Sequence, residues 1–399
     1  MPEAAELLLG LAKAPESETL ELIDACGRVL AESVYARLAS PPFDKSPFDG
    51  YAFRGEDTAS ASPENPVTLT ITEEIPAGSA PTKPVTAGTC AKILTGAPMP
   101  EGANATIGYE RVQFTAETVT FLSPFAAGSN VVRAGEDITA GSLLAERGEV
   151  LTPAHIGVLA SQGFTRVNVY KKPVIGVIST GSELVRPGEE LKKGQIYNSS
   201  LFAIGSFLRS WGAELGCLDM VGDDPDVIAS ALGGALEKCD CVLTTGGASV
   251  GDYDCDVAEA DKVGPEVVLR SVRMKPGGAM IASVKDGKLI LGLSGNPASA
   301  LLALLMVGMP HIKALCGRRD LQWSETTAAL LEPFGKKSPQ FRYLRGRVFP
   351  ENGRVMFRPN EGQGNGSLMS FCDCNAIALI PAGSPPQPAG TELKIFVLK

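Results

Sequence analysis

The sequence has little basic charge, few histidines and no long hydrophobic run. Lysine and arginine number 36 against 45 aspartate and glutamate, so the formal net charge is −9. This balance argues against nucleic acid or an anionic membrane as the main partner. The first fourteen residues carry two glutamates and no basic flank, unlike a signal peptide. The longest apolar stretch, 298–307, is about half of what a membrane span needs. We therefore expect a cytoplasmic protein with no membrane and no nucleic-acid partner.

The cysteines indicate a reducing compartment and no zinc site. They are nine in number, scattered and mostly within apolar runs, which favours reduced core thiols. The Cys-Asp-Cys pairs at 239–241 and 372–374 have the wrong spacing for a zinc knuckle. Only His155 and His311 could complete such a site.

A chain of 399 residues is expected to form two to four domains. The patterning predicts an α/β plus β, multidomain fold, with a central doubly wound, mostly parallel sheet. The expected parts are an N-terminal linking domain with helices at 1–54 and 141–172, a small β-rich subdomain at 55–140, an α/β domain at 173–322 and a small C-terminal β domain at 323–399.

The α/β prediction rests on two apolar strands that break abruptly into glycine-containing turns. Residues 173–179 lead into Thr180-Gly181-Ser182-Glu183, and 241–245 lead into 246–251. Apolar residues recur at helical spacing between them, from Ile204 to Leu215 and again from Val227 to Leu236. Alternating strands and helices predict parallel βαβ units, in which ligands bind at the carboxyl ends of the strands. Both turns are therefore expected to share one crevice.

Two further turns are expected beside that crevice. A strand at 289–293 is followed by Ser-Gly-Asn-Pro, in which Asn296 and Pro297 are typical of a helix start. A Lys-Pro-Gly turn at 275–277 adds a point charge. Glycine-rich turns offer unobstructed N–H groups to phosphate. The expected ligand-binding residues are Thr180, Gly181, Ser182, Gly246, Gly247, Ser249, Gly251, Arg273, Pro276, Gly277, Ser294, Gly295 and Asn296.

Acidic residues accompany these turns and would repel phosphate without a cation. They are Glu183, Asp223, Asp224, Asp252 and Asp254. Mg²⁺ held by one or two carboxylates and by substrate phosphate is the usual solution. The pattern thus predicts a phosphorylated ligand with Mg²⁺.

The N-terminal half contributes two ambiguous residues. The loop 41–52 contains Asp49, and a strand ending in a Gly/Pro turn at 92–100 contains Thr95. The aspartate is either a turn-former or a functional acid, and the threonine either a ligand hydroxyl or an ordinary strand residue.

Seven segments, in this order along the chain, resemble the molybdopterin molybdenumtransferase family, to which the C-terminal domain of gephyrin is related. They read PPFDKSPFDGYA, ILTGAPMPEGAN, NVVRAGED, GVISTGSELVRPGEELKKGQIYNSS, TTGGASVGDYD, MKPG and SGNPASA. The resemblance implies transfer of molybdenum from molybdate to the dithiolene of adenylyl-molybdopterin, with AMP release and Mg²⁺ as a participant. It also implies an elongated homodimer of four domains.

The same resemblance assigns site residues and partners. The functional positions of the family map to Asp49, Thr95, Glu183, Asp223, Asp254 and Lys275, of which Glu183, Asp223 and Asp254 would hold the metal. Two of the six lie in the N-terminal half, so the family architecture implies that the dimer partner completes the site. The adenylyltransferase of the preceding step and recipient molybdoenzymes are further expected partners.

Two positions depart from the family pattern. Ser271 stands where the family often has a second lysine, and Asn365 interrupts a turn that usually reads Gly-Ser-Gly. We expect Arg273 to supply the missing charge, because in a strand Ser271 and Arg273 would share one face, as would Lys275 if the strand continued that far. Two other functions stay open: the preceding adenylyltransferase step, because its fold resembles residues 173–322, and a non-catalytic dimeric scaffold.

Overall fold

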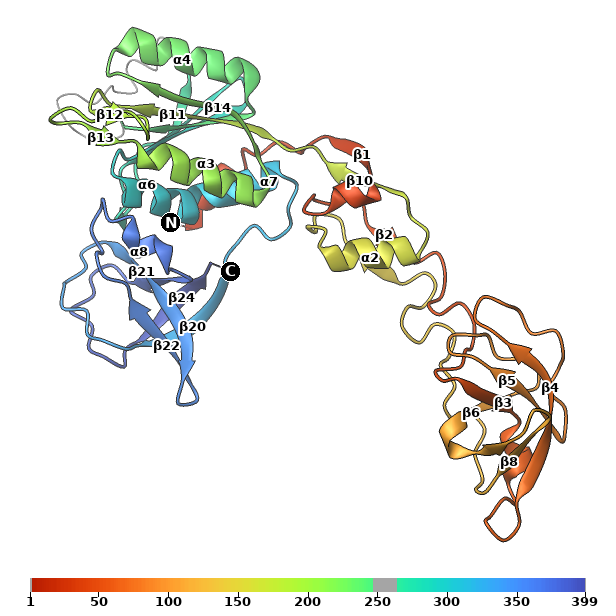
Figure 1. Ribbon diagram of the computed structural model, residues 1–399. Helices are drawn as coiled ribbons and strands as arrows, with labels where there is room; N and C mark the ends of the chain where they lie inside the picture. Colours follow the sequence, from red (N-terminus) through yellow and green to blue (C-terminus); the bar gives the residue numbers. More distant parts are fainter. Residues whose placement is uncertain (1, 247–263, 399) are drawn as a thin grey trace. The chain divides into compact units, whose positions relative to one another are not determined.

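The computed structural model describes residues 2–246 and 264–398, which form two compact units (Figure 1). The first unit comprises Met1–Glu32, Arg147–Thr152 and Arg166–Lys399, and the second comprises Ser33–Glu146 and Pro153–Thr165. Gly247, Ser249, Gly251, Asp252 and Asp254 lie outside the described residues. The division into four sequence segments stays a prediction.

A six-stranded sheet forms the centre of the first unit. Its order is β14 (Glu214–Val221), β11 (Val174–Thr180), β15 (Cys241–Thr245), β19 (Lys288–Leu293), β18 (Met280–Lys285) and β16 (Glu266–Leu269). The first four strands are parallel, whereas β18 pairs antiparallel with both β19 and β16. The sheet is therefore mixed, because the tight turn at 286–287 returns the chain beside β19 without a crossover helix.

Two predicted helices connect the parallel strands, and one of them ends earlier than expected. Asn198 caps α3 (Ser199–Trp211), since its side-chain Oδ1 accepts from Leu201 N at 3.1 Å. Gly212 ends this helix with φ 105°, a left-handed conformation that favours glycine. Leu215, which the helical spacing included, therefore lies in β14. The second helix, α4 (Pro225–Lys238), begins at Asp224, whose side chain accepts from Asp226 N and Val227 N.

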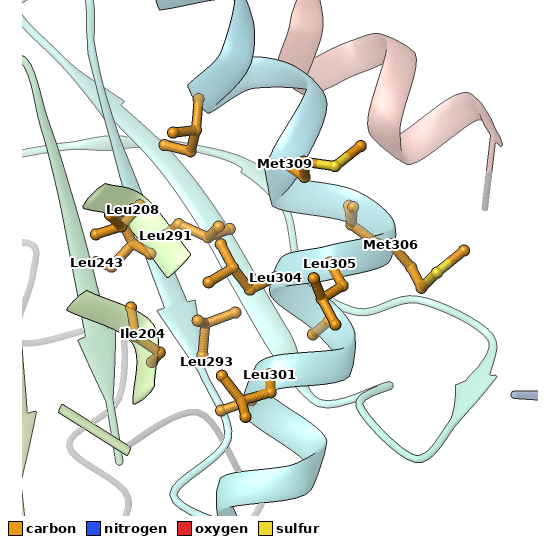
Figure 2. Packing of buried hydrophobic residues seen from close by; sticks show 14 of the residues in the cluster. Ile204, Leu208, Leu243, Leu291, Leu293, Leu301, Leu304, Leu305, Met306 and Met309 are labelled. Atoms are coloured by element: carbon orange, nitrogen blue, oxygen red, sulfur yellow. The ribbon is translucent and has the colours of Figure 1, made fainter. Parts of the chain in front are cut away.

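A continuous helix from Pro297 to Leu315 fills the core under this sheet. It comprises α6 (Pro297–Ala303), a π-helical turn (Leu304–Gly308) and α7 (Met309–Leu315). In the described residues it alone is long and apolar enough to span a membrane, and 89% of its most apolar 18-residue window is buried. Figure 2 shows Leu301 and Leu304 of this helix with Leu291 and Leu293 of β19. The apolar run, longer than the expected ten residues, is thus a core helix.

The C-terminal residues form a closed, barrel-like sheet in the same unit. Its strands are β21 (Phe341–Glu351), β22 (Arg354–Pro359), β20 (Ser324–Leu330), β24 (Glu392–Val397) and β23 (Ala376–Ile380), and β23 also pairs with β21. A short strand from the α/β segment, β17 (Met274–Lys275), joins β21. Since β17 covers only these two residues, Ser271 and Arg273 lie outside a strand, and the expected shared strand face is wrong.

Short elements at the N-terminus complete the first unit. Helix α1 (Pro2–Leu9) packs against α7. Strand β1 (Ser17–Glu21) pairs with β10 (Arg166–Tyr170) in an antiparallel ladder.

The second unit is built on another six-stranded sheet. Its order is β6 (Ala105–Gly108), β3 (Gly50–Phe53), β5 (Thr89–Ile93), β4 (Val67–Ile75), β8 (Thr118–Phe121) and β7 (Gln113–Phe114). The expected loop 41–52 thus ends in a strand, because β3 pairs with both β5 and β6. Only glycine fits at position 50, where a Cβ would lie 1.8 Å from Ile107 O. This unit also contains α2 (Pro153–Ser161), the ladder of β2 (Val34–Tyr35) with β9 (Leu143–Ala145), and two short 3-10 helices at Gly55–Thr58 and Tyr109–Arg111.

We predict that Leu304→Ala destabilises the first unit by roughly 2–5 kcal/mol, the usual cost of a Leu→Ala cavity in a core. Leu304 is fully buried in the cluster of Figure 2. Urea unfolding followed by tryptophan fluorescence reports this unit, because both tryptophans lie in it. The matched control is Leu7→Ala, since Leu7 is 42% exposed. Equal losses in the two variants would contradict the core assignment.

Candidate functional site

The turn after β11 presents Glu183 at the carboxyl end of the central sheet. Gly181 adopts φ 149°, and its N–H donates to Val221 O at 3.2 Å. A Cβ on Gly181 would lie 2.7 Å from Glu183 Oε2, so the glutamate carboxylate folds back over this glycine. The side chains of Ser182 and Glu183 are both exposed. The turn therefore offers a carboxylate to any ligand that approaches the strand ends.

Asp223 is held on the same turn by two hydrogen bonds. The backbone N–H of Ser182 donates to Asp223 Oδ2 at 2.9 Å, and the Ser182 hydroxyl donates to the same oxygen at 2.6 Å. These bonds fix an exposed carboxylate that follows β14 beside a turn that follows β11. The structure thus brings Glu183 and Asp223 to one edge of the sheet, as expected.

The other two predicted turns lie at the same edge. Thr180 Oγ1 donates to Thr245 O at 3.4 Å, and a Cβ on Gly246 would lie 2.3 Å from Thr180 Oγ1. A Cβ on Gly295 would lie 3.6 Å from Gly246 Cα. The glycines therefore allow the turns after β11, β15 and β19 to approach one another closely. Asn296 is the cap residue of α6, although its side chain makes no capping bond and Ser294 Oγ accepts from Asn296 N instead.

Four backbone N–H groups in the described parts of these turns are already occupied, and residues 247–251 of the expected cradle lie outside the described residues. The N–H groups of Gly181, Ser182, Gly246 and Asn296 all donate to acceptors within the protein. The glycines serve close packing, and the edge exposes carboxylates and hydroxyls. An anionic ligand at this edge consequently requires a cation.

Asn198, which sequence reasoning did not single out, forms a buried polar cluster under these turns. Ser179 Oγ lies 2.8 Å from Thr245 Oγ1 and 3.5 Å from Asn198 Oδ1. Asn198 Nδ2 is buried and has no partner in the part of the chain that the structure describes. The signal available in the sequence was an Asn before an apolar helical run, which is typical of an N-cap.

The Lys-Pro-Gly turn packs on the start of α6. A Cβ on Gly277, whose φ is 95°, would lie 2.9 Å from Ser299 O. Pro276 and Gly277 are buried, whereas Arg273 and Lys275 are exposed. This turn is therefore positioned by α6, and the assignment of positive charge to Arg273 stays a prediction.

Arg345 is a second residue that sequence reasoning missed. It is fully buried on β21, where Nε donates to Ser370 Oγ at 2.7 Å and Nη2 donates to the carbonyls of Gly362 and Gly364 at 3.1 Å. Nη1 has no partner among the described residues. Burial lowers the pKa of this guanidinium to about 10. In the sequence Arg345 is one of several arginines on a predicted strand, and only the closed sheet buries it.

The loop that Arg345 holds reaches the start of α6. Asn365 O accepts from Ser299 N at 3.1 Å. Ser299 thus contacts the Lys-Pro-Gly turn through its carbonyl and the 362–367 loop through its N–H. Two cationic residues therefore belong to segments that meet at Ser299: Lys275 in the Lys-Pro-Gly turn, and Arg345, which holds the 362–367 loop.

Asp49 and Thr95 form a separate pair in the second unit. The antiparallel register places Gly50 of β3 opposite Ile93 of β5, so the residues flanking these strand ends meet. Asp49 Oδ1 accepts from Thr95 N at 2.7 Å and from Thr95 Oγ1 at 2.6 Å. These bonds lower the pKa of Asp49, which is exposed. The pair therefore presents an ionised carboxylate at neutral pH.

The described residues contain no group of three or more His, Cys, Asp and Glu side chains that could hold a metal ion. Glu183 and Asp223 are the two carboxylates at the strand-end turns, and the third expected ligand, Asp254, lies outside the described ranges. Two carboxylates supplemented by ligand phosphate and water suit Mg²⁺, which is reluctant to give up all its waters. The residues present fit that ion.

We predict that Thr95→Val raises the pKa of Asp49 toward the ordinary aspartate value. The variant removes the hydroxyl donor, the largest contribution to the lowered pKa. Carboxyl carbon NMR shifts recorded from pH 2 to 7 measure the change. The control is Asp44, whose pKa is lowered by Ala134 N and Arg133 and should stay the same. An unchanged titration of Asp49 would contradict the role of the hydroxyl.

Family models match three consecutive parts of the chain. Residues 1–163 match the MoeA N-terminal region (domain I and II), residues 176–314 a probable molybdopterin binding domain, and residues 327–398 the MoeA C-terminal region (domain IV). The matched regions include both the Asp49–Thr95 pair and the strand-end turns.

Individual relatives match over nearly the whole chain. A molybdopterin molybdenumtransferase of Staphylococcus aureus (strain MSSA476) is 32% identical over 99% of this chain and 94% of its own length. One from Bacillus subtilis (strain 168) is 33% identical over 100% and 93%. A crystal structure of a molybdopterin biosynthesis MoeA protein from Pyrococcus horikosii superposes with a TM-score of 0.84 and 30% identity, covering 100% of this chain and 98% of that one. The chain belongs to the MoeA family of molybdopterin molybdenumtransferases.

Proposed function

We propose that this enzyme is a molybdenum insertase of molybdenum cofactor biosynthesis, which transfers molybdenum from molybdate to the dithiolene of adenylyl-molybdopterin and releases AMP. One structural observation is the main support for this proposal. The turns after the parallel strands bring two carboxylates, Glu183 and Asp223, to the edge of the sheet where ligands of such folds bind. Family membership supports a molybdopterin-related ligand for this edge.

Mg²⁺ is the proposed metal at this edge, held by Glu183, Asp223 and Asp254. When bound, the ion would neutralise phosphate oxygens and polarise the bond to the leaving AMP. Ser182 keeps Asp223 in place through its N–H and hydroxyl, so the carboxylate is oriented before ligand arrives. The glycines at 181, 246 and 295 let the turns pack closely, which keeps the carboxylates together at this edge.

Positive charge for the oxyanion substrate is proposed to come from the elements around Ser299. Lys275 is an exposed ammonium at the start of the Lys-Pro-Gly turn, and Arg345 is a buried guanidinium without a carboxylate partner among the described residues. Molybdate carries two negative charges, which a net acidic protein must compensate locally. Arg273 is proposed to add the charge that Ser271 lacks.

The protein is further proposed to be a cytoplasmic homodimer. Asp49 and Thr95 belong to the second unit, whereas Glu183, Asp223 and Lys275 belong to the first. The family resemblance implies that residues of both parts serve one reaction, and a symmetric dimer supplies them from two chains. The adenylyltransferase of the preceding step and recipient molybdoenzymes are the proposed protein partners.

The alternative functions are less well supported. An adenylyltransferase would need only the central α/β part, but the matches extend over both flanking regions. A non-catalytic scaffold would not require the fixed carboxylate of Asp223 or the ionised carboxylate of Asp49.

We predict that Asp223→Asn abolishes most AMP release without unfolding the protein. The amide oxygen still accepts from Ser182, but it no longer carries the charge that binds Mg²⁺. The matched control is Asp224→Asn, because Asp224 caps α4 and asparagine caps helices equally well. Steady-state AMP release should fall at least 100-fold in the first variant and stay near wild type in the second. Normal turnover of Asp223→Asn at an unchanged melting temperature would refute the metal site.

We predict that two inactive variants complement each other if the active site draws on both chains. Random exchange between Asp49→Ala and Asp223→Asn dimers should restore about a quarter of wild-type AMP release, since half of the dimers are mixed and each holds one intact site. Native mass spectrometry verifies exchange, and each variant alone is the control. A mixture that stays inactive after complete exchange would rule out the shared site.

A further inference from the structure

A cavity lies at the amino ends of the parallel strands, opposite the strand-end turns. It has a volume of about 450 Å³, within the range of small-molecule sites. Three distant segments meet there: the turn after α1, the connection between β10 and β11, and the start of β19. Apolar side chains such as Leu289 and Leu315 line it together with charged ones.

The cavity is separate from the strand-end turns. Val174, which begins β11, lines the cavity, whereas Thr180 ends the same strand beside Gly246. Val174 and Thr180 are six residues apart on β11, which corresponds to about 20 Å along the strand. A ligand in this cavity would therefore leave the candidate active site free.

The charge of the cavity is opposite to that of the protein. Four lysines and two acids line it, a formal charge of +2 in a chain of net charge −9. They are Lys13, Lys171, Lys172, Lys288, Glu16 and Asp240. Cations gathered in a concave site focus the field on an entering anion.

Two of these ammonium groups are not neutralised. Glu16 pairs with Lys171 at 2.7 Å, and Lys288 Nζ donates to Leu236 O at 2.6 Å. Lys13 Nζ lies 3.4 Å from a backbone carbonyl, that of Asp286. Neither Lys13 nor Lys172 has a carboxylate partner within the described parts of the chain. Both are exposed and carry charge that is free to bind an anion.

His311 adds a buried polar group to the lining. It is 1% exposed, and its Nδ1 lies 2.7 Å from Leu8 O, so Nδ1 carries the proton and donates. Nε2 is then an acceptor, and it has no partner among the described residues. An unsatisfied buried acceptor is costly, and a ligand hydroxyl that reached it would remove that cost.

We propose that this cavity binds a small phosphorylated molecule. Lysine ammonium groups act as point charges that suit phosphate, and no arginine lines the cavity to select a planar carboxylate. The apolar lining of Leu289 and Leu315 would cover the organic part of the ligand.

Inorganic pyrophosphate is the probe that tests this proposal. It is titrated calorimetrically into the full-length protein in EDTA, because the acidic strand-end turns repel phosphate when no metal is present. The variant K13Q/K172Q removes the two free charges of the cavity. The control K336Q/K337Q removes two exposed lysines from a C-terminal loop, with the same change in net charge. Melting temperatures of both variants verify folding.

Wild type and K336Q/K337Q should bind pyrophosphate equally, and K13Q/K172Q should bind at least tenfold more weakly. Equal affinity in all three proteins would place the binding elsewhere and overturn the proposal. Absence of binding to wild type at 10 mM pyrophosphate would overturn it as well. Tighter binding of citrate than of pyrophosphate would replace the phosphate class with a polycarboxylate.

Discussion

The parallel hydrogen bonding of β11, β15 and β19 is the constraint on which the proposed active site depends. Ser179 pairs with Thr245, and Thr245 pairs with Leu293, so the three strands end at one level. The turns that follow them can meet only because of this register. Burial of the helix from Pro297 to Leu315 against these strands stabilises the arrangement (Figure 2).

The electrostatics of the strand-end turns differ from a simple phosphate cradle. Among the described residues of these turns, the N–H groups of Gly181, Ser182, Gly246 and Asn296 donate within the protein. The exposed groups there include the acids Glu183 and Asp223 and the hydroxyl of Ser182. Exposed carboxylates of this kind bind phosphate only when a divalent cation lies between the carboxylates and the phosphate. The basic cavity at the amino ends of the parallel strands binds anions through ammonium groups instead, so the two sites should respond oppositely to removal of metal.

Local sequence signals predicted the elements that depend on neighbouring residues. The apolar strands at 174–180 and 241–245, the helix after Asp224 and the helix start at Asn296-Pro297 are all present, although the Asn296 side chain makes no capping bond. Local signals gave wrong element bounds where the bounds depend on pairing with residues distant in the sequence. The predicted helix extended to Leu215, because an apolar residue there suits either a helix or a strand. The left-handed conformation of Gly212 ends the helix before it. The strand assumed for Ser271 to Lys275 is short because its partner is β21, far along the chain.

The candidate site shows the same division. Glycines and acids at strand ends were visible in the sequence, and the family resemblance assigned Asp49 and Thr95, whose hydrogen bonds require a β3–β5 register that spacing does not reveal. Arg345 was missed because only the closed sheet buries it, and Asn198 was missed because its N-cap pattern does not reveal that its side chain is buried under the turns.

The insertase function is tested most directly by the reaction of the purified protein with adenylyl-molybdopterin and Mg²⁺, with and without molybdate. We expect AMP release together with formation of molybdenum cofactor, both dependent on molybdate. Consumption of ATP with molybdopterin would instead indicate the adenylyltransferase step. Absence of both activities in a folded, dimeric protein would contradict the insertase function and favour a non-catalytic scaffold.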